Sequence, residues 1–276
     1  MLLGLVSVLS LLISLTICFF SGAFAGLSWL WILPVGFLGA FLILVALGFA
    51  FLMVLCRRVD QSVPQDGEDK LYRTVAELIV ESALPFLRIS VKTSGLEKVP
   101  KDGRFLVVAN HTNDSDPIIL LYALPGRQLA FVSKKENSTM FVIGPMMHKL
   151  QCQLINREND REALKTILKC IQILKEDKAS IGVFPEGGID ADGLLHRFKP
   201  GVFKIAQKAK VPIVVCTLKN TKPVVHNILH FKPSHVEMNV LEVIPVEELT
   251  GVTTVEIAQR CHQLMAEDLG PELVAD

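Results

Sequence analysis

The chain has 276 residues, half of them hydrophobic, and carries 28 basic and 28 acidic side chains. This balance excludes the strongly basic composition typical of nucleic-acid-binding proteins, so we expect no nucleic-acid partner. The charges are unevenly distributed, because the first 56 residues contain no Lys, Arg, Asp, Glu or His. The sequence therefore combines an apolar N-terminal segment with a globular part that is long enough to bury its own core.

The six cysteines, at positions 18, 56, 152, 170, 216 and 261, have neither the spacing of a C-x-x-C redox motif nor that of a zinc site. Two of them lie inside the apolar segment. We expect them to be small buried hydrophobic side chains in a reducing compartment, and we expect no metal or cofactor site.

The apolar segment contains two long uncharged stretches, Leu2–Ala25 and Trp29–Leu55. A helix needs about 20 residues to cross the roughly 30 Å hydrocarbon core of a bilayer. We therefore predict a transmembrane helical hairpin over residues 1–58. Arg57 and Arg58 close the second stretch, and the positive-inside rule then places the rest of the chain in the cytoplasm.

Two other interpretations fit this segment. Ala23-Phe24-Ala25 has the small-x-small form of a signal-peptide cleavage site, although the basic start of a signal peptide is missing and the apolar run is too long. A re-entrant hairpin, which enters only one leaflet, would have the same composition.

Residues 59–91 predict a linker and one helix. Asp60–Asp69 contains Pro64 and Gly67 and has the composition of a loop. From Leu71 the apolar residues recur at helical spacing until Pro85, so we expect an amphipathic helix that packs on the core.

The remaining residues, 92–276, form the main predicted globular domain. Short apolar runs bounded by turns suit strands that are buried on both faces. The predicted strands are Ile89–Thr93, Phe105–Ala109, Gln128–Ser133, Gln153–Asn156, Ser180–Phe184, Pro212–Thr217 and Val236–Ile244. The clearest helical patterns between them are Arg161–Lys175, Val202–Ala209 and Thr254–Leu269. This alternation predicts an α/β domain, with a largely parallel mixed sheet flanked by helices and sites at the carboxyl ends of strands.

Polar side chains follow the strand Phe105–Ala109 directly, and His111 is among them. Pro117 suits the first position of the next helix, which makes Asp116 its expected N-cap, turned back toward His111. A carboxylate that accepts from one imidazole nitrogen leaves the other free to take a proton from an alcohol. A loop histidine beside a helix cap would explain the same residues without any chemistry.

A second polar block, Phe184-Pro185-Glu186-Gly187-Gly188, follows the strand Ser180–Phe184. Its two glycines would let a substrate approach the backbone closely and leave N–H groups free to bind it. A tight turn with an exposed glutamate is the alternative interpretation.

Taken together, these blocks resemble the glycerolipid acyltransferase family, in particular the 1-acylglycerol-3-phosphate acyltransferases. The first block is Asn110-His111 with Asp116, an H-x4-D pattern, and the third is Phe184-Pro185-Glu186-Gly187. The other matching stretches are Phe131–Glu136, Ile155–Arg157, Phe198–Ala206 and Val211–Val214. The resemblance covers Lys92–Leu218 and keeps the family's order and spacing.

The resemblance implies the transfer of a fatty acyl group to the free hydroxyl of lysophosphatidic acid, giving phosphatidic acid at a lipid bilayer. The donor would be acyl-CoA or acyl-acyl carrier protein, without a cofactor or an acyl-enzyme. His111 would be the general base and Asp116 its orienting partner. The substrate-binding residues would be Asn110, Lys134, Arg157, Glu186, Gly187 and Gly188. Among these, Glu186 and Gly187 would contact the glycerol part and Arg157 the phosphate.

The third block departs from the family pattern. The family commonly has Glu-Gly-Thr-Arg there, whereas Gly188 and Ile189 occupy the last two positions of this chain. A cation expected near the phosphate is therefore missing, and Arg197 or Lys199 is a candidate to replace it. Another lysophospholipid or glycerol 3-phosphate is accordingly an alternative acceptor.

Two interpretations from other functional classes fit part of the sequence. Asp114-Ser115-Asp116 is a D-x-D, the pattern with which a metal-dependent glycosyltransferase would hold a sugar nucleotide. A non-catalytic lipid-binding homologue could also carry the altered third block.

Overall fold

The computed structural model describes residues 2–156 and 159–275. The chain divides into two compact units, Met1–Ser62 and Val63–Asp276. Each unit is described by itself below.

The N-terminal unit is a hairpin of two helices, α1 (Leu2–Phe20) and α2 (Trp29–Arg57), each long and apolar enough to cross a membrane by length and composition. The hydroxyl of Ser14 on α1 donates to the carbonyl of Leu33 on α2, 2.6 Å away. A Cβ atom at Gly36 would lie 2.7 Å from that hydroxyl, so glycine permits the close approach. Most large apolar side chains of both helices face outward. The buried residues are small, namely Ser10, Ser14, Cys18, Ala40 and Cys56. The predicted apolar hairpin is therefore present.

The globular unit is built around a seven-stranded sheet in the order β1-β7-β6-β2-β5-β3-β4. The strands are β1 (Ile89–Ser94), β2 (Leu106–Ala109), β3 (Leu129–Lys134), β4 (Gln153–Ile155), β5 (Ser180–Val183), β6 (Ile213–Lys219) and β7 (Ser234–Ile244). All neighbouring strands are parallel except β6 and β7, which are antiparallel. As a consequence, β1 and β7 begin at the end of the sheet where the other five strands have their carboxyl ends. We call such an end of the sheet an edge, and the word does not denote an outermost strand. The predicted largely parallel mixed sheet is confirmed.

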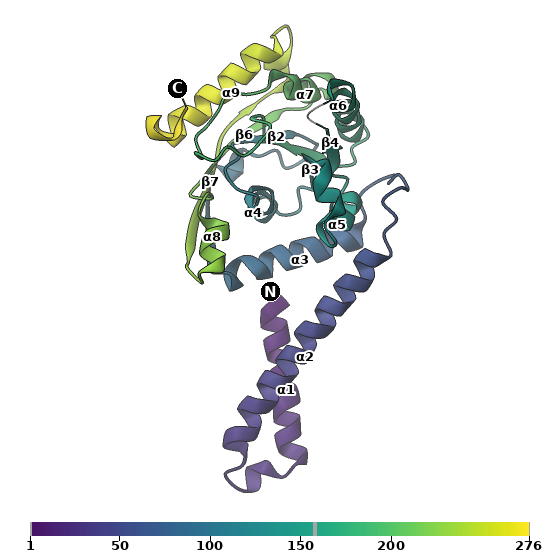
Figure 1. Ribbon diagram of the computed structural model, residues 1–276, viewed down its shortest axis with the longest axis vertical. Coiled ribbons are helices and arrows are strands. Elements are labelled where there is room, and N and C mark those ends of the chain that lie inside the picture. The colour runs from purple at the N-terminus through teal and green to yellow at the C-terminus, as the bar shows by residue number, and fades with distance from the viewer. Residues whose placement is uncertain (1, 157–158, 276) are drawn as a thin grey trace. The chain divides into compact units, whose positions relative to one another are not determined.

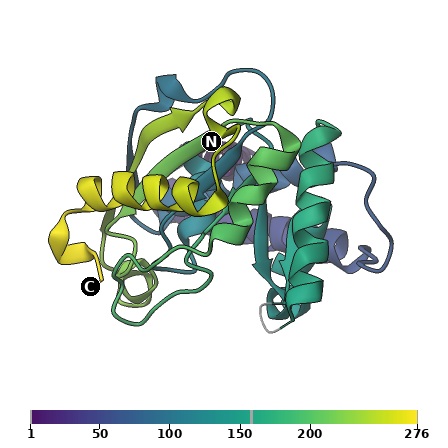
Figure 2. The same ribbon diagram turned by 90° about the horizontal axis from the view of Figure 1, so that it is seen from above.

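Helices cover both faces of this sheet (Figures 1 and 2). They are α3 (Lys70–Phe86), α4 (Asp116–Ala123), α5 (Ile143–Lys149), α6 (Asp160–Lys175), α7 (Lys204–Ala209), α8 (Val224–Leu229) and α9 (Thr254–Leu269). Helices α6, α7 and α9 pack on one face, and α3, α4 and α8 on the other. Along β2, Leu106 and Val108 belong to the first core, and Val107 and Ala109 belong to the second. This strand is buried on both faces, which explains its uninterrupted apolar sequence.

Candidate active site

Asn110 and His111 follow the carboxyl end of β2. The side chain of Asn110 is buried and bonded on both sides to β6: its Nδ2 donates to the carbonyl of Leu218 at 2.9 Å, and its Oδ1 accepts the N–H of Leu218 at 2.7 Å. Asn110 therefore fastens the end of β2 to the end of β6. Since both the nitrogen and the oxygen of this side-chain amide are used in this way, the geometry gives Asn110 a structural role.

The imidazole of His111 lies against the carboxylate of Asp116, with Nδ1 2.9 Å from Oδ2. The same oxygen accepts the backbone N–H groups of Thr112 and Asn113 at 2.8 and 2.9 Å, so the loop wraps around the carboxylate. Asp116 is fully buried and is the first residue of α4. The N-cap of this helix is Ser115 and not Asp116, so the prediction was wrong by one position. Among the described residues, no hydrogen bond engages Nε2 of His111, the nitrogen that a general base needs.

Aromatic stacking fixes the plane of this imidazole. The ring of Phe184, at the end of β5, stacks on His111 with centroids 4.1 Å apart and planes 18° apart. Phe131 on β3 stacks in turn on Phe184 at 6.3 Å. The row has room because residue 182 is glycine, where a Cβ atom would lie 2.5 Å from the Phe131 ring. His111 is thus held between a carboxylate at its Nδ1 edge and a ring on its face.

Glu186 binds two stretches of backbone. Its Oε1 accepts the N–H of His111 at 2.7 Å, and its Oε2 accepts the N–H of His196 at 2.9 Å. Burial raises the pKa of this carboxyl to about 6, although both N–H groups favour the charged form. The family resemblance implies that Glu186 contacts the glycerol part of an acceptor, whereas in the structure both of its oxygens accept backbone N–H groups of the chain itself.

Gly187 adopts a φ of +80°, in the left-handed region that favours glycine. The side chain of Lys199 lies across it, because a Cβ atom at Gly187 would come within 2.7 Å of the Lys199 Nζ. The backbone N–H of Lys199 also donates to the carbonyl of Pro185 at 2.8 Å. An exposed ammonium group is thereby placed on the third block, where the family's arginine is absent.

The structure describes all but one of the other predicted substrate-binding residues. Arg157 lies outside the described residues. Lys134 is the last residue of β3 and is exposed at the same sheet edge as His111. Gly188 continues the turn after Gly187, and Arg197 is exposed two positions before Lys199.

Several contacts at this edge have no signal in the sequence. The hydroxyls of Thr112 and Thr221 are 2.6 Å apart, and Nδ2 of Asn113 donates to the carbonyl of Lys222 at 3.0 Å. These bonds fasten the His111 loop to the connection between β6 and α8. Because the partners stand 109 residues apart, no local pattern could have revealed them.

No sequence pattern predicts a role for His196. Its Nε2 lies 3.0 Å from the carboxylate of Asp192, which raises the pKa of His196. The long loop after the third block is thereby held together by its own side chains as well as by Glu186.

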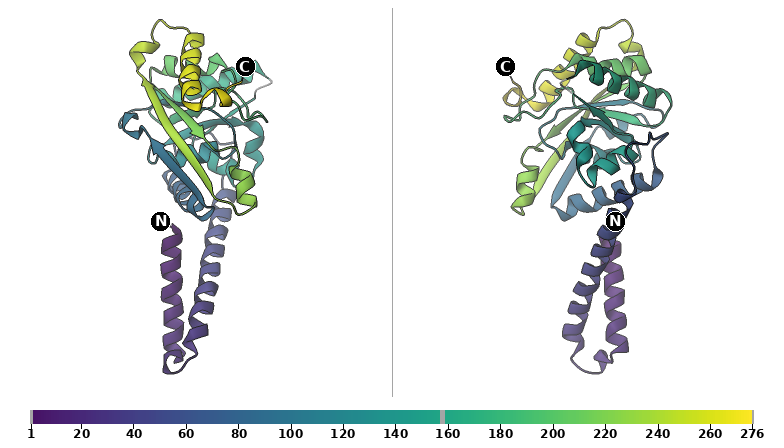
Figure 3. Two further views of the ribbon diagram at one scale, coloured as in Figure 1. Left: turned by 90° about the vertical axis from the view of Figure 1, so that its left-hand side faces the viewer. Right: turned by 45° about the vertical axis from the view of Figure 1, so that its right-hand side comes forward.

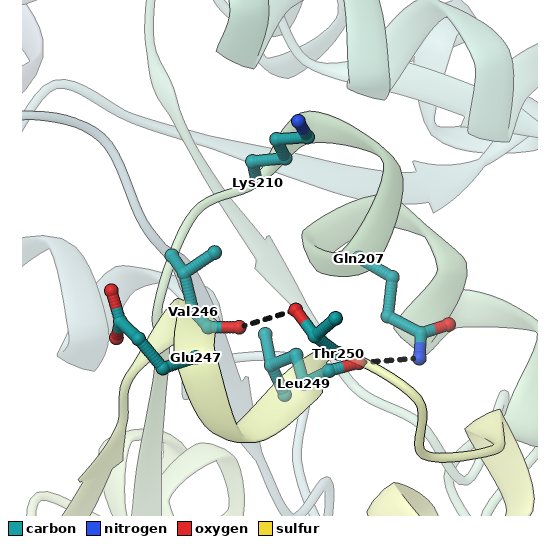
Figure 4. Close-up of a pocket in the computed structure, with 6 residues that line it drawn as sticks. All are labelled: Gln207, Lys210, Val246, Glu247, Leu249 and Thr250. Carbon is teal, nitrogen blue, oxygen red and sulfur yellow. Dashed lines mark hydrogen bonds between the residues drawn. The ribbon is translucent and has the colours of Figure 1, made fainter.

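A hollow of about 410 Å³ is present elsewhere on the globular unit (Figure 4). It is lined by Gln207, Lys210, Val246, Glu247, Leu249 and Thr250. Val246 follows the carboxyl end of β7, which pairs with the beginning of β6. The hollow therefore lies at the sheet edge opposite to His111, and we assign it no part in the candidate site.

Several known proteins are similar to this chain in sequence. A family profile described as Acyltransferase matches residues 90–219. A Chlamydomonas reinhardtii protein named 1-acyl-sn-glycerol-3-phosphate acyltransferase is 31% identical over 212 residues, which are 74% of this chain and 61% of that protein. The chloroplastic protein of that name from Arabidopsis thaliana is 32% identical over 154 residues, 55% of this chain and 42% of its own. The chain thus spans less than two thirds of the length of these relatives.

The fold has a counterpart among solved structures. The crystal structure of the 1-acyl-sn-glycerophosphate acyltransferase PlsC from Thermotoga maritima superposes with a TM-score of 0.62 at 22% identity, and the match covers 80% of this chain and 86% of that one. At this identity the likeness concerns the fold alone. From the matched profile and the many relatives of one name, the chain belongs to the acyltransferase family, within which it is similar to proteins named 1-acyl-sn-glycerol-3-phosphate acyltransferase.

Proposed function

We propose that this protein transfers a fatty acyl group from an acyl thioester to the free hydroxyl of lysophosphatidic acid, giving phosphatidic acid. The observation that carries the proposal is the contact between Nδ1 of His111 and the buried carboxylate of Asp116, which leaves Nε2 free at the carboxyl end of β2. The names of the relatives favour this acceptor over other lysophospholipids and glycerol 3-phosphate.

In the proposed reaction, Asp116 accepts the Nδ1–H of His111 and so keeps Nε2 unprotonated. Nε2 takes the proton of the acceptor hydroxyl while that oxygen attacks the thioester carbonyl carbon. The new C–O bond forms, the C–S bond breaks, and the thiolate leaves with the proton from the imidazolium. The donor is acyl-CoA or acyl-acyl carrier protein, and no cofactor takes part.

A general base of this kind accelerates a reaction by about 10²- to 10⁴-fold. The remainder has to come from holding two substrates together and from donors to the oxyanion. A covalent thiol route is disfavoured, because burial raises the pKa of Cys170 to about 12 and also raises that of Cys216, so neither thiol is readily ionised.

The acceptor phosphate would meet cations on the edge that carries His111. Lys199 lies over Gly187, and Lys134 ends β3 on the same edge. Arg157 is a third cation by the family resemblance. The N–H of Gly187 donates to the carbonyl of Phe184 at 3.1 Å and is not available to a substrate, so Gly188 is the residue that would let the glycerol part approach the backbone closely.

The two apolar helices fit this role, because acceptor and product are both membrane lipids. We propose that α1 and α2 span the bilayer and that the globular unit lies in the cytoplasm, since Arg57 and Arg58 follow the second span. Attachment of this kind depends on apolar burial and not on charge, so high salt should leave the protein in the membrane.

The two rival classes fit the site less well. Asp114 is exposed, whereas Asp116 is buried and its Oδ2 already accepts from three nitrogens, which suits a positioning carboxylate better than a metal ligand. A non-catalytic lipid-binding protein would have no use for a histidine oriented in this way.

The test is release of free thiol from acyl-CoA by the purified full chain in lipid nanodiscs, with lysophosphatidic acid as acceptor and mass spectrometry of the product. We expect thiol release that needs the acceptor and resists a chelator. Release that a chelator abolishes would favour the metal-dependent alternative. Binding of lipid without any thiol release, across a panel of acceptors, would favour the non-catalytic one.

A further inference from the structure

Three large apolar side chains of the globular unit project into solvent close together. Phe86 ends α3 and is 68% exposed, Leu229 ends α8 and is 72% exposed, and Phe231 in the following turn is 86% exposed. Burying large apolar side chains stabilises a fold, so leaving three of them in water forgoes a substantial stabilisation. We call these three residues the apolar tip.

Strand pairing brings the members of the tip together. β1 and β7 are parallel with Ile89 opposite Ser234, and Phe86 and Phe231 each stand three residues before those positions. The guanidinium of Arg88 donates to the carbonyl of Phe231 at 2.9 Å. Figure 1 shows α8 beside the end of α3. The tip is therefore one surface contributed by two distant parts of the chain.

The tip lies at the same sheet edge as the candidate active site. β7 runs antiparallel to β6, with Glu237 near its beginning opposite Lys219 at the end of β6. β2, which leads to His111, runs parallel to β6. The beginning of β7 and the end of β2 are therefore on one edge, and Figure 3 shows β7 running away from α8.

The backbone of Phe231 also adopts an unfavourable conformation. Its φ is +55°, in the left-handed region that is unfavourable for a residue with a side chain. A glycine would relieve this strain, and the exposed ring contributes little burial to the fold in return. A bulky residue kept in such a conformation points to a function for the ring outside the folded chain.

The surroundings of the tip are basic. Residues 221–236 contain Lys222, Lys232 and three histidines but no Asp or Glu. Arg88, His230 and Lys232 are all exposed. A cluster of apolar side chains with cations beside it matches the interface of a bilayer, where rings enter the acyl boundary and cations meet anionic headgroups.

We propose that the apolar tip inserts into the lipid bilayer and turns the His111 edge of the sheet toward the membrane surface. This contact is additional to the apolar hairpin, and its purpose rests on the proposed function. The headgroup of an acceptor lipid would then reach His111 while the acyl chain stays in the bilayer.

The experiment is fluorescence quenching by brominated lipid. Trp29→Phe and Trp31→Phe remove the chain's two tryptophans, and Phe231→Trp then introduces a single reporter in the full chain. With brominated phosphatidylcholine vesicles containing phosphatidylglycerol, we expect the emission to fall roughly two-fold or more relative to unbrominated vesicles. The matched control is Leu168→Trp in the same background, an exposed leucine on α6, which should lose almost no emission.

Equal emission with both kinds of vesicle would overturn the proposal. So would concentration-dependent dimerisation that Phe231→Asp abolishes, because the tip would then be an interface between two copies. Quenching needs no turnover. It therefore tests the tip separately from the transferase assay, and an active enzyme without quenching would contradict the docking alone.

Discussion

The carboxylate of Glu186 accepts the backbone N–H of His111, with Oε1 and N 2.7 Å apart. Its second oxygen accepts the N–H of His196, so one buried side chain joins the loop that carries the base to the loop after the third block. With both oxygens engaged in this way, Glu186 is suited to position His111 and not to bind the acceptor.

Glu186→Gln should lower kcat about 10²-fold and change the acceptor KM little. The amide of glutamine offers one acceptor oxygen, so one of the two N–H groups loses its partner and His111 is displaced. A displacement of this kind lowers the rate about 10²-fold. Steady-state kinetics would measure both constants, with Glu247→Gln, an exposed residue at the opposite edge, as control. A raised KM with unchanged kcat would instead support contact with the glycerol part.

Protonation of Glu186 at low pH should lower the activity and raise the free energy of unfolding. Burial raises the pKa of this carboxyl from 4.5 to about 6, so it gains a proton as the pH falls through 6 and can no longer accept two N–H groups fully. We therefore expect kcat/KM to fall below about pH 6. Because the folded state binds this proton more tightly than the unfolded state, the free energy of unfolding decreases as the pH rises from 4.5 to 6, by about 2 kcal/mol.

The measurement is thermal unfolding and activity between pH 4.5 and 7, compared with Glu186→Gln, which lacks this titration. The difference in stability between the two proteins should change across that window and level off above it. A constant difference would show that Glu186 titrates at its ordinary pKa.

Lys199→Ala should raise the KM for lysophosphatidic acid about ten-fold, because a hydrogen bond to a charged group is worth about 1.5 to 3 kcal/mol. Arg197→Ala removes the same charge from an exposed position two residues away and should change this KM less than about two-fold. Kinetics with a range of acceptor concentrations would separate the two variants. An unchanged KM for Lys199→Ala would show that another group binds the phosphate.

Gly182→Ala should disturb both folding and catalysis. The new Cβ would lie 2.5 Å from the ring of Phe131, which stacks on Phe184 and through it on His111. Overpacking of this kind costs about 1 to 3 kcal/mol, so the melting temperature should fall. We expect kcat to fall as well, measured well below the melting temperature, because the ring against the imidazole is displaced. A destabilised variant with normal kcat would show that the stacked row does not position the base.

The elements that carry the site could be predicted because their signals are local. β2 is an uninterrupted apolar run and β5 is a fully buried strand of small and apolar residues, and each ends at the polar block that the sequence indicates. The H-x4-D spacing brings His111 and Asp116 together within one loop, since only four residues separate them. Boundaries agree to within a few residues, as expected where helix and strand ends fray.

The remaining features depend on contacts between distant residues. Helices α5 and α8 have seven and six residues, too few for a helical period to emerge. The alternating burial of β7 is visible in its sequence, but its antiparallel direction is set by pairing with β6. The bonds of Glu186 to two stretches of backbone, and the position of Lys199 over Gly187, likewise arise only once the strands are ordered in the sheet.

The central claim is that His111 acts as a base through its contact with Asp116, and the most direct test is kcat for His111→Ala, Asp116→Asn and the double variant, with exposed Asp114→Asn as control. We predict a loss of about 10²- to 10⁴-fold for His111→Ala with an intact fold. The double variant should be no slower than His111→Ala, because Asp116 acts only through the imidazole. Activity retained by His111→Ala, or two losses that multiply in the double variant, would contradict this mechanism.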